Sequence, residues 1–268
     1  MLKDITLGQY FPGNSLIHRL DPRTKLIALI IYIVALFSAG NWLSYGLVFT
    51  FLATCIGISQ IPVKAFARGM KPLVLILIFT GILNLFFTPG ETVLLSLWKI
   101  TVTLEGVTRA IFMMVRILLL ISGTFLLTYT TSPISLTDGL ESLLGPLKKI
   151  RVPVHELSMM MCIALRFIPT LIEETDKIMS AQKARGADFE SGRLMERVKA
   201  LVPILVPLFI SAFRRADELA TAMECRCYHG GEGRTKMKLL RYKRRDFLSF
   251  GFLIFLLAVV IVIRNLGL

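Results

Sequence analysis

The sequence predicts an all-α polytopic membrane protein with about five transmembrane helices and long helices on the cytoplasmic side. Of its 268 residues, 54% are hydrophobic and 18% are charged, whereas soluble domains average about 45–50% apolar residues, glycine included, and about 25% charged residues. The apolar residues gather in stretches that approach the roughly 17–20 residues a spanning helix needs. A chain this apolar is not disordered, and four cysteines do not suffice for a small disulfide scaffold.

Five apolar stretches are the predicted spans, and each carries almost no charge. They are Lys25 to Gly40, Trp42 to Ile61, Pro72 to Phe87, Ile117 to Thr131 and Phe247 to Ile263. Several lie near the lower length limit, so we expect them to depend on flanking residues or neighbouring helices. Asp21 predicts a turn or helix start before the first span. Arg116, which is embedded in the backward extension of the fourth, contacts a partner or a neighbouring helix, or reaches toward the membrane surface.

Basic residues in the short loops predict the orientation, because Lys and Arg accumulate on the cytoplasmic side. Three precede or open the first span and three lie between spans two and three, whereas the next loop holds one lysine with two glutamates. These residues are Arg19, Arg23 and Lys25, then Lys64, Arg68 and Lys71, then Lys99 with Glu91 and Glu105. The prediction is a membrane region of four spans over residues 1–131, a cytoplasmic segment over 132–246 and a final transmembrane helix over 247–268.

The cytoplasmic segment is helical in composition. Ser132 and Pro133 open a short helix, with serine as the cap and proline in the first turn. A long helical pattern then runs from Val154 almost to Gly186, and a second runs from Arg193 to about Tyr228. Each long pattern contains proline and has an apolar half and a charged half. We expect the apolar halves to pack on each other or under the bilayer, with the charged ends in the cytoplasm.

A weak repeat marks the polar ends of these two helices. Ser180–Arg193 aligns with Thr221–Arg234, and four of the fourteen positions are identical: Ala181/Ala222, Arg185/Arg226, Gly192/Gly233 and Arg193/Arg234. In each copy one arginine stands between two small residues, Ala184 and Gly186 in the first and Cys225 and Cys227 in the second. An arginine in that setting can enter a groove and bind a carboxylate or carbonyls with two hydrogen bonds. The alternative is that both arginines only solvate a helix terminus and favour its dipole.

Three segments together resemble the T components of energy-coupling factor (ECF) transporters, the family that includes the cobalt-transport permease CbiQ. The first is His18 to Lys25, which reads HRLDPRTK before the first span. The others are ARG at 184–186 and CRC at 225–227 with the following YHGGEGRT, which resemble the family's two X-Arg-X motifs. The order of spans, cytoplasmic helices and final span is also similar, so the resemblance covers essentially the whole chain.

The resemblance implies a non-catalytic scaffold in the bacterial or archaeal cell (inner) membrane. Such a T component sits beside a substrate-binding S component, and its cytoplasmic coupling helices dock into grooves on two ABC ATPase subunits. ATP hydrolysis by those subunits moves the helices, so that the S component reorients to take up a vitamin or metal ion. Carried over by position, Arg185 with Ala184 and Gly186 contacts one ATPase, and Arg226 with Cys225 and Cys227 contacts the other. The second motif usually opens with a residue such as alanine; Cys225 stands there and is also small.

The apolar halves of the two long helices are the expected contact with the S component. The candidate residues are Met159, Met160, Met161, Phe167, Leu205 and Phe209. Methionine is flexible and suits a surface that repacks during movement. Ordinary core filling is the alternative for the methionines.

Other functions find less support in the sequence. Cys225 and His229 share one helix face but give two metal ligands where structural zinc needs four, so we expect no metal and no cofactor. Nucleic-acid binding is suggested only by the net charge of +13, because aromatic residues do not interleave the basic runs. A membrane enzyme would need clustered carboxylates or histidines near a span end. The remaining alternative is a self-sufficient secondary transporter or other membrane permease, which would place polar groups and broken helices within the spans.

Overall fold

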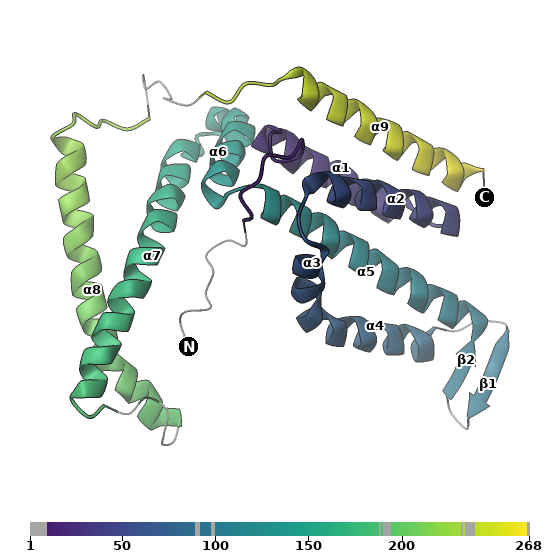
Figure 1. Ribbon diagram of the computed structural model, residues 1–268, viewed down its shortest axis with the longest axis horizontal. Helices are drawn as coiled ribbons and strands as arrows, with labels where there is room; N and C mark the ends of the chain where they lie inside the picture. The colour runs from purple at the N-terminus through teal and green to yellow at the C-terminus, as the bar shows by residue number, and fades with distance from the viewer. Residues whose placement is uncertain are drawn as a thin grey trace. The chain divides into compact units, whose positions relative to one another are not determined.

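The computed structural model describes residues 10–88, 92–97, 100–187, 189, 194–231, 233 and 239–266. They fall into two compact units, one within Glu141–Leu239 and the other formed by Gly8–Leu140 with Leu240–Leu268. Helices make up nearly all of both units (Figure 1), which confirms the predicted fold class. One short antiparallel hairpin, β1 (Val93–Leu97) with β2 (Ile100–Thr103), was not predicted.

Four helices form the core of the second unit. They are α1 (Pro22–Ser38), α2 (Trp42–Ser59), α5 (Leu104–Thr130) and α9 (Arg244–Asn265), and α1 and α2 each pack on both α5 and α9. The side chains buried between them are mostly aliphatic or aromatic: Tyr32, Leu36, Ala39, Tyr45, Val48, Leu52, Leu119, Leu253, Leu256 and Val260. Because α1 and α9 lie at opposite ends of the sequence, this packing closes the unit around its first and last helices.

The chain between α2 and α5 packs on the outside of α5. A short helix, α3 (Val63–Met70), leads through a 3-10 turn into α4 (Val74–Phe87), which lies along α5. Within α3 only Phe66 is buried, and its ring meets the ring of Tyr129 at 5.2 Å. The hairpin β1–β2 then connects α4 to α5, as Figure 1 shows.

Five helices are long and apolar enough to cross a membrane, by length and composition and among the described residues. They are Trp42–Ser59, Val63–Phe87, Leu104–Thr130, Val154–Ala184 and Arg244–Asn265. The predicted number is therefore confirmed, and four of the five predicted spans correspond to these helices, but one member of the set differs. The predicted first span corresponds to α1, whose 17 residues lie at the lower limit of about 17 for a span. The helix Val154–Ala184 belongs to the set because its first half is apolar. Length and composition alone do not distinguish an apolar helix that packs against protein from one that crosses the membrane.

Three local predictions within the second unit are settled by contacts. The Asp21 carboxylate accepts a hydrogen bond from the Arg23 N–H and caps α1, and the Ser132 hydroxyl does the same for the Ser135 N–H at the start of α6 (Pro133–Leu144). Arg116 serves a neighbouring helix: it donates to the Tyr45 hydroxyl at 2.8 Å and to the Ala39 carbonyl at 3.2 Å. The second bond satisfies a carbonyl that the end of α1 leaves open.

The first unit contains the two long helices. These are α7 (Val154–Ala184) and α8 (Leu194–Glu224), which pack on each other and run in opposite directions. Arg215 of α8 donates to Glu174 of α7 at 2.8 Å. Pro169 lies inside α7, and Pro203 and Pro207 lie inside α8. α8 ends at Glu224 rather than near Tyr228, and Gly192, Arg193 and Arg234 of the sequence repeat lie outside the described residues.

Candidate functional site: two arginines at matching helix ends

Arg185 directly follows the last residue of α7, Ala184. The Gly186 N–H donates to the Lys183 carbonyl at 3.0 Å, and the Ala187 N–H donates to the Gln182 carbonyl at 3.0 Å. Gly186 has a φ of +86°. This pair of bonds around a left-handed residue is the Schellman motif, in which the residue before the left-handed one caps the helix. Arg185 is that capping residue.

The end of α8 repeats the same backbone motif. The Cys227 N–H donates to the Glu224 carbonyl at 2.8 Å, and the Tyr228 N–H donates to the Met223 carbonyl at 3.0 Å. Cys227, with a φ of +54°, occupies the left-handed position that Gly186 holds in α7. Arg226 is therefore the capping residue of α8. The weak sequence repeat thus corresponds to one local structure used twice, with the two arginines in equivalent places.

Both arginines are open to binding. Arg185 and Arg226 are exposed, as are their neighbours Ala184, Gly186, Cys225 and Cys227. Neither guanidinium forms a hydrogen bond or an ion pair within the part of the chain that the structure describes. A free guanidinium offers a planar set of donors that matches a carboxylate, and the small neighbours leave room around it.

The two arginines lie at opposite ends of the α7–α8 pair. Arg185 lies beside the connection between the helices, whereas the segment after Arg226 returns to the start of α7. There Gly231 approaches the ring of His155 so closely that a Cβ atom would lie 2.5 Å from it, and the His155 Nδ1 lies 3.1 Å from a Glu141 carboxylate oxygen. Because α8 has 31 residues, the arginines are separated by roughly 45 Å at about 1.5 Å per residue.

Apolar side chains cover parts of α7 and α8 that no described residue buries. Met160 and Met161 on α7 are exposed, as are Leu205 and Phe209 on α8, with Phe209 at 62%. Met159 and Phe167 are half-buried. An exposed surface of this kind in a membrane protein faces either lipid or another protein.

A buried polar cluster lies where α1 and α9 begin, and it was not predicted from the sequence. Asp246, only 2% exposed, accepts hydrogen bonds from the Asp21 N–H at 3.0 Å and from the Lys243 N–H at 2.7 Å. Arg23 pairs with Asp21 at 3.1 Å and lies over the ring of Tyr242. The signal that could have found this cluster is a single acidic residue, Asp246, at the end of a basic run.

The basic end of α1 joins the same region to α5. The Lys25 ammonium donates to the Thr130 carbonyl at 2.8 Å, to the Thr131 hydroxyl at 3.2 Å and to the His18 carbonyl at 3.4 Å. The His18 ring bonds the Ser15 hydroxyl and the Phe11 carbonyl, and its burial lowers its pKa. The HRLDPRTK segment therefore supplies structural contacts that hold α1, α5 and α9 together.

No group of three His, Cys, Asp or Glu side chains that could hold a metal occurs among the described residues. Cys225 and Cys227 are exposed free thiols. The guanidinium groups of Arg185 and Arg226 are exposed hydrogen-bond donors, and such donors can recognise a carboxylate or carbonyl oxygen.

Comparison with known proteins decides the family. Residues 13–237 match the model of the cobalt transport protein family CbiQ. The chain belongs to this family. Relatives named energy-coupling factor transporter transmembrane protein EcfT are 54% identical in Ruminiclostridium cellulolyticum, over 98% of both chains, and 57% identical in Acidaminococcus fermentans, over 93% of this chain and 92% of the relative. The Bacillus subtilis protein of that name is 48% identical over 98% of this chain and all of its own.

The CbiQ/EcfT family accounts for the architecture described above. Its members with these names are transmembrane proteins of energy-coupling factor transporters, and this chain has the apolar helices of a multi-pass membrane protein. The chain is a membrane subunit of such a transporter, and a self-sufficient secondary transporter is not favoured.

Proposed function

We propose that this T component transmits ATP-driven movement from two ABC ATPase subunits to a substrate-binding S component. The chain itself is non-catalytic in this scheme, and the ATPase subunits hydrolyse ATP. α7 and α8 act as the coupling helices. The transported vitamin or metal ion is selected by the S component.

The observation that carries this proposal is the shared structure of the two helix ends. Arg185 and Arg226 occupy the same position of the same Schellman motif, and both guanidinium groups are exposed. Two equivalent binding elements on one chain match two copies of an ATPase or two similar ATPases. The arginines lie at opposite ends of the α7–α8 pair, roughly 45 Å apart by the length of α8. Each one therefore reaches a different ATPase subunit.

The apolar surfaces of α7 and α8 complete the mechanism. Ion pairing between Glu174 and Arg215 links the two helices midway between the arginines. When the ATPases approach or separate, the helix ends move with them, and the crossing of the helices shifts. The exposed Met160, Met161, Leu205 and Phe209 then move the S component, with which they and the half-buried Met159 and Phe167 are in contact.

This mechanism requires α7, α8 and the N-terminus to lie on the cytoplasmic side of the cell membrane. The orientation is supported by the basic residues around α1, α3 and the start of α9. Lys64 and Arg68 are exposed on α3, whose Phe66 faces inward. A short helix with basic residues outward and an apolar residue inward suits the cytoplasmic membrane surface.

Reversal of charge at both arginines tests the proposal. We expect Arg185→Glu with Arg226→Glu to release both ATPase subunits from the detergent-purified complex, because a carboxylate cannot replace the guanidinium donors and repels acidic partners. Each single variant should lose about half of the ATPase or bind it more weakly. Co-purification through a tag on this chain, with densitometry of the ATPase bands, gives the measurement.

The matched controls are Arg166→Glu on α7 and Arg214→Glu on α8, which change exposed arginines away from the helix ends. These controls should retain both ATPases. If the double variant retains both ATPases as the wild type does, the two-arginine anchor is wrong.

A further inference from the structure

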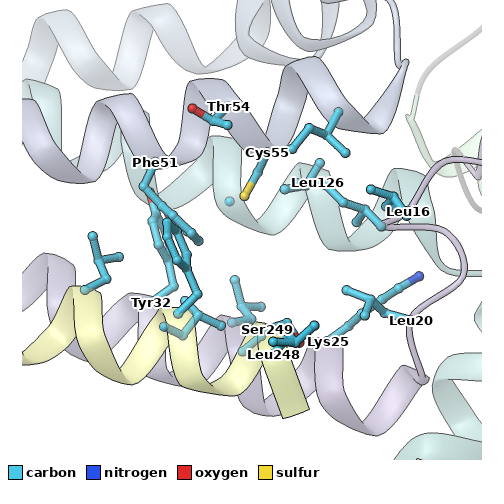
Figure 2. A pocket seen from close by; sticks show the side chains of 18 of the residues that line it. Leu16, Leu20, Lys25, Tyr32, Phe51, Thr54, Cys55, Leu126, Leu248 and Ser249 are labelled. Atoms are coloured by element: carbon cyan, nitrogen blue, oxygen red, sulfur yellow. The ribbon is translucent and has the colours of Figure 1, made fainter. Parts of the chain in front are cut away.

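A cavity of about 980 Å³ lies within the second unit and is lined by side chains of α1, α2, α5 and α9 and of the segment before α1. Figure 2 shows it from close by, with Tyr32 and Phe51 together at one side and Lys25 and Leu20 at the other. Ligand sites in proteins commonly occupy about 300–1,000 Å³, so this cavity is large enough for a sizeable molecule. Its lining is almost wholly apolar along the helices.

The cavity exists because α2 and α9 diverge toward one end of the unit. The Phe51 ring packs against Phe252 with centroids 5.6 Å apart, so the helices touch there. Beyond that contact, Thr54 and Ile58 of α2 face Leu248 of α9 across the cavity. Leu248 is 73% exposed, which leaves the cleft open on the surface between α2 and α9.

The end of the cleft is positively charged. Its lining there includes Lys25 and Arg245, and the arginine has no hydrogen-bond or ion-pair partner among the described residues. The carboxylates nearby are already engaged: Asp246 accepts two backbone N–H groups, and Asp21 pairs with Arg23. Lys25 donates its hydrogen bonds to α5 and to the His18 carbonyl. The exposed Arg245 guanidinium therefore remains for an anionic group.

We propose that this cleft binds an anionic phospholipid, with one acyl chain between α2 and α9 and the phosphate at Arg245. An acyl chain fits an apolar cleft that has a cation only at its end. The basic end is the cytoplasmic end in the orientation proposed above, which is the leaflet where anionic headgroups meet basic residues. The lipid would fill the gap between α2 and α9 and so hold α9, the helix that follows α7 and α8 in the chain, in its position.

The geometry favours a lipid chain over a helix of a partner protein. A helix with its side chains is about 10 Å wide or more, and the contact of Phe51 with Phe252 prevents it from lying between α2 and α9 along their length. An acyl chain is one methylene wide and can pass beside these rings. The polar end of the cleft also matches a lipid phosphate, since arginine binds phosphate oxygens with two hydrogen bonds.

Native mass spectrometry of the complete transporter complex and of the full chain tests the proposal. Equal amounts of phosphatidylglycerol and phosphatidylcholine are added to the delipidated protein in mild detergent. We expect one phosphatidylglycerol to remain bound per chain and Arg245→Gln to reduce its preference over phosphatidylcholine about tenfold. Arg264→Gln, at the opposite end of the same helix, is the control and should keep the preference.

A second pair of variants tests the place of the acyl chain. Thr54→Trp fills the cleft and should abolish retention of the lipid, whereas Phe49→Trp, at an exposed position of α2 that does not line the cleft, should retain it. Equal retention of the two lipids by the wild type, or full retention by Thr54→Trp, would overturn the proposal. It is also wrong if no lipid is retained and Thr54→Trp instead releases another membrane subunit from the complex. None of these readouts depends on Arg185 or Arg226, so they are independent of the ATPase test.

Discussion

At the scale of single residues, the two arginines depend on the residue that follows each of them. A left-handed residue ends the helix and turns the chain away, which leaves the arginine at an exposed corner. Glycine adopts this conformation freely, whereas other L-residues lose roughly 1–2 kcal/mol in it. α7 has Gly186 at that place and α8 has Cys227. The two ends therefore share a shape but differ in stability, and α8 ends with the more strained residue.

Reciprocal substitutions should change the two helix ends in opposite directions. Gly186→Ala places a side chain at a φ of +86° and should weaken the end of α7 by about 1 kcal/mol, whereas Cys227→Gly should strengthen the end of α8 by a similar or smaller amount. Hydrogen exchange at the amides of residues 186–187 and 227–228 measures both effects, because these amides form the closing hydrogen bonds. A change of the same sign at both ends would contradict the argument from the left-handed conformation.

At the scale of helices, one buried carboxylate joins the first helix of the chain to the last. Asp246 lies in the first turn of α9, and its two oxygens accept the Asp21 N–H before α1 and the Lys243 N–H before α9. Each helix start leaves N–H groups without partners inside the helix, and a single side chain satisfies one at each. This contact fixes the relative position of α1 and α9 at the charged end of their bundle.

Removal of the Asp246 carboxylate should destabilise the bundle more than removal of a carboxylate that does not accept two buried hydrogen bonds. We expect Asp246→Ala to lower the free energy of unfolding by about 2–4 kcal/mol, since two buried hydrogen bonds to a charged group are lost. Asp246→Asn keeps one acceptor oxygen, so its free energy of unfolding should lie between those of Asp246→Ala and the wild type. Thermal unfolding in detergent, followed by loss of the monodisperse peak, gives the ranking.

The control for this prediction is Asp138→Ala in α6. This half-buried carboxylate forms no such bonds with the residues that the structure describes, so its removal should change the midpoint of thermal unfolding little. Equal loss of stability in both alanine variants would mean that Asp246 does not join the helices as described.

At the scale of the whole molecule, some helix surfaces carry mainly basic residues, and others carry charged residues of both signs. Basic residues cluster at the starts of α1 and α9 and on α3, and charged residues of both signs lie on the second halves of α7 and α8. The hairpin β1–β2 lies at the other end of α5 from this basic region. Such a division is what the distribution of Lys and Arg across a membrane produces.

Cysteine labelling tests this arrangement across the membrane. In a variant that keeps only the exposed Cys225 and is expressed without ATPase subunits, a membrane-impermeant maleimide should label inside-out vesicles and leave intact cells unlabelled, because the end of α8 is proposed to be cytoplasmic. A single cysteine introduced as Thr92→Cys, at the exposed start of the hairpin, should show the reverse pattern. Labelling of Cys225 from outside intact cells would exclude the proposed orientation.

The sequence predicted those features that depend on residues close together in the chain. Helix caps such as Asp21 and Ser132 follow from local hydrogen bonding, and the apolar stretches follow from the thickness of the bilayer. The two arginines were found because small neighbours and a change in helix composition are local signals. The end of α8 was predicted near Tyr228 but lies at Glu224. Cysteine at positions 225 and 227 does not indicate a helix end, whereas glycine does so at Gly186.

By itself, the sequence determined that this is a helical membrane protein, where its helices lie and which two arginines stand at corresponding helix ends. Only the tertiary structure decided the contacts made across long distances in the chain. Asp21 and Asp246 are 225 residues apart, Arg116 meets Tyr45 across 71 residues, and the cleft arises where α2 and α9 diverge. Such contacts depend on how helices pack, and the pattern of apolar residues along one helix does not specify which side chain of another helix it meets.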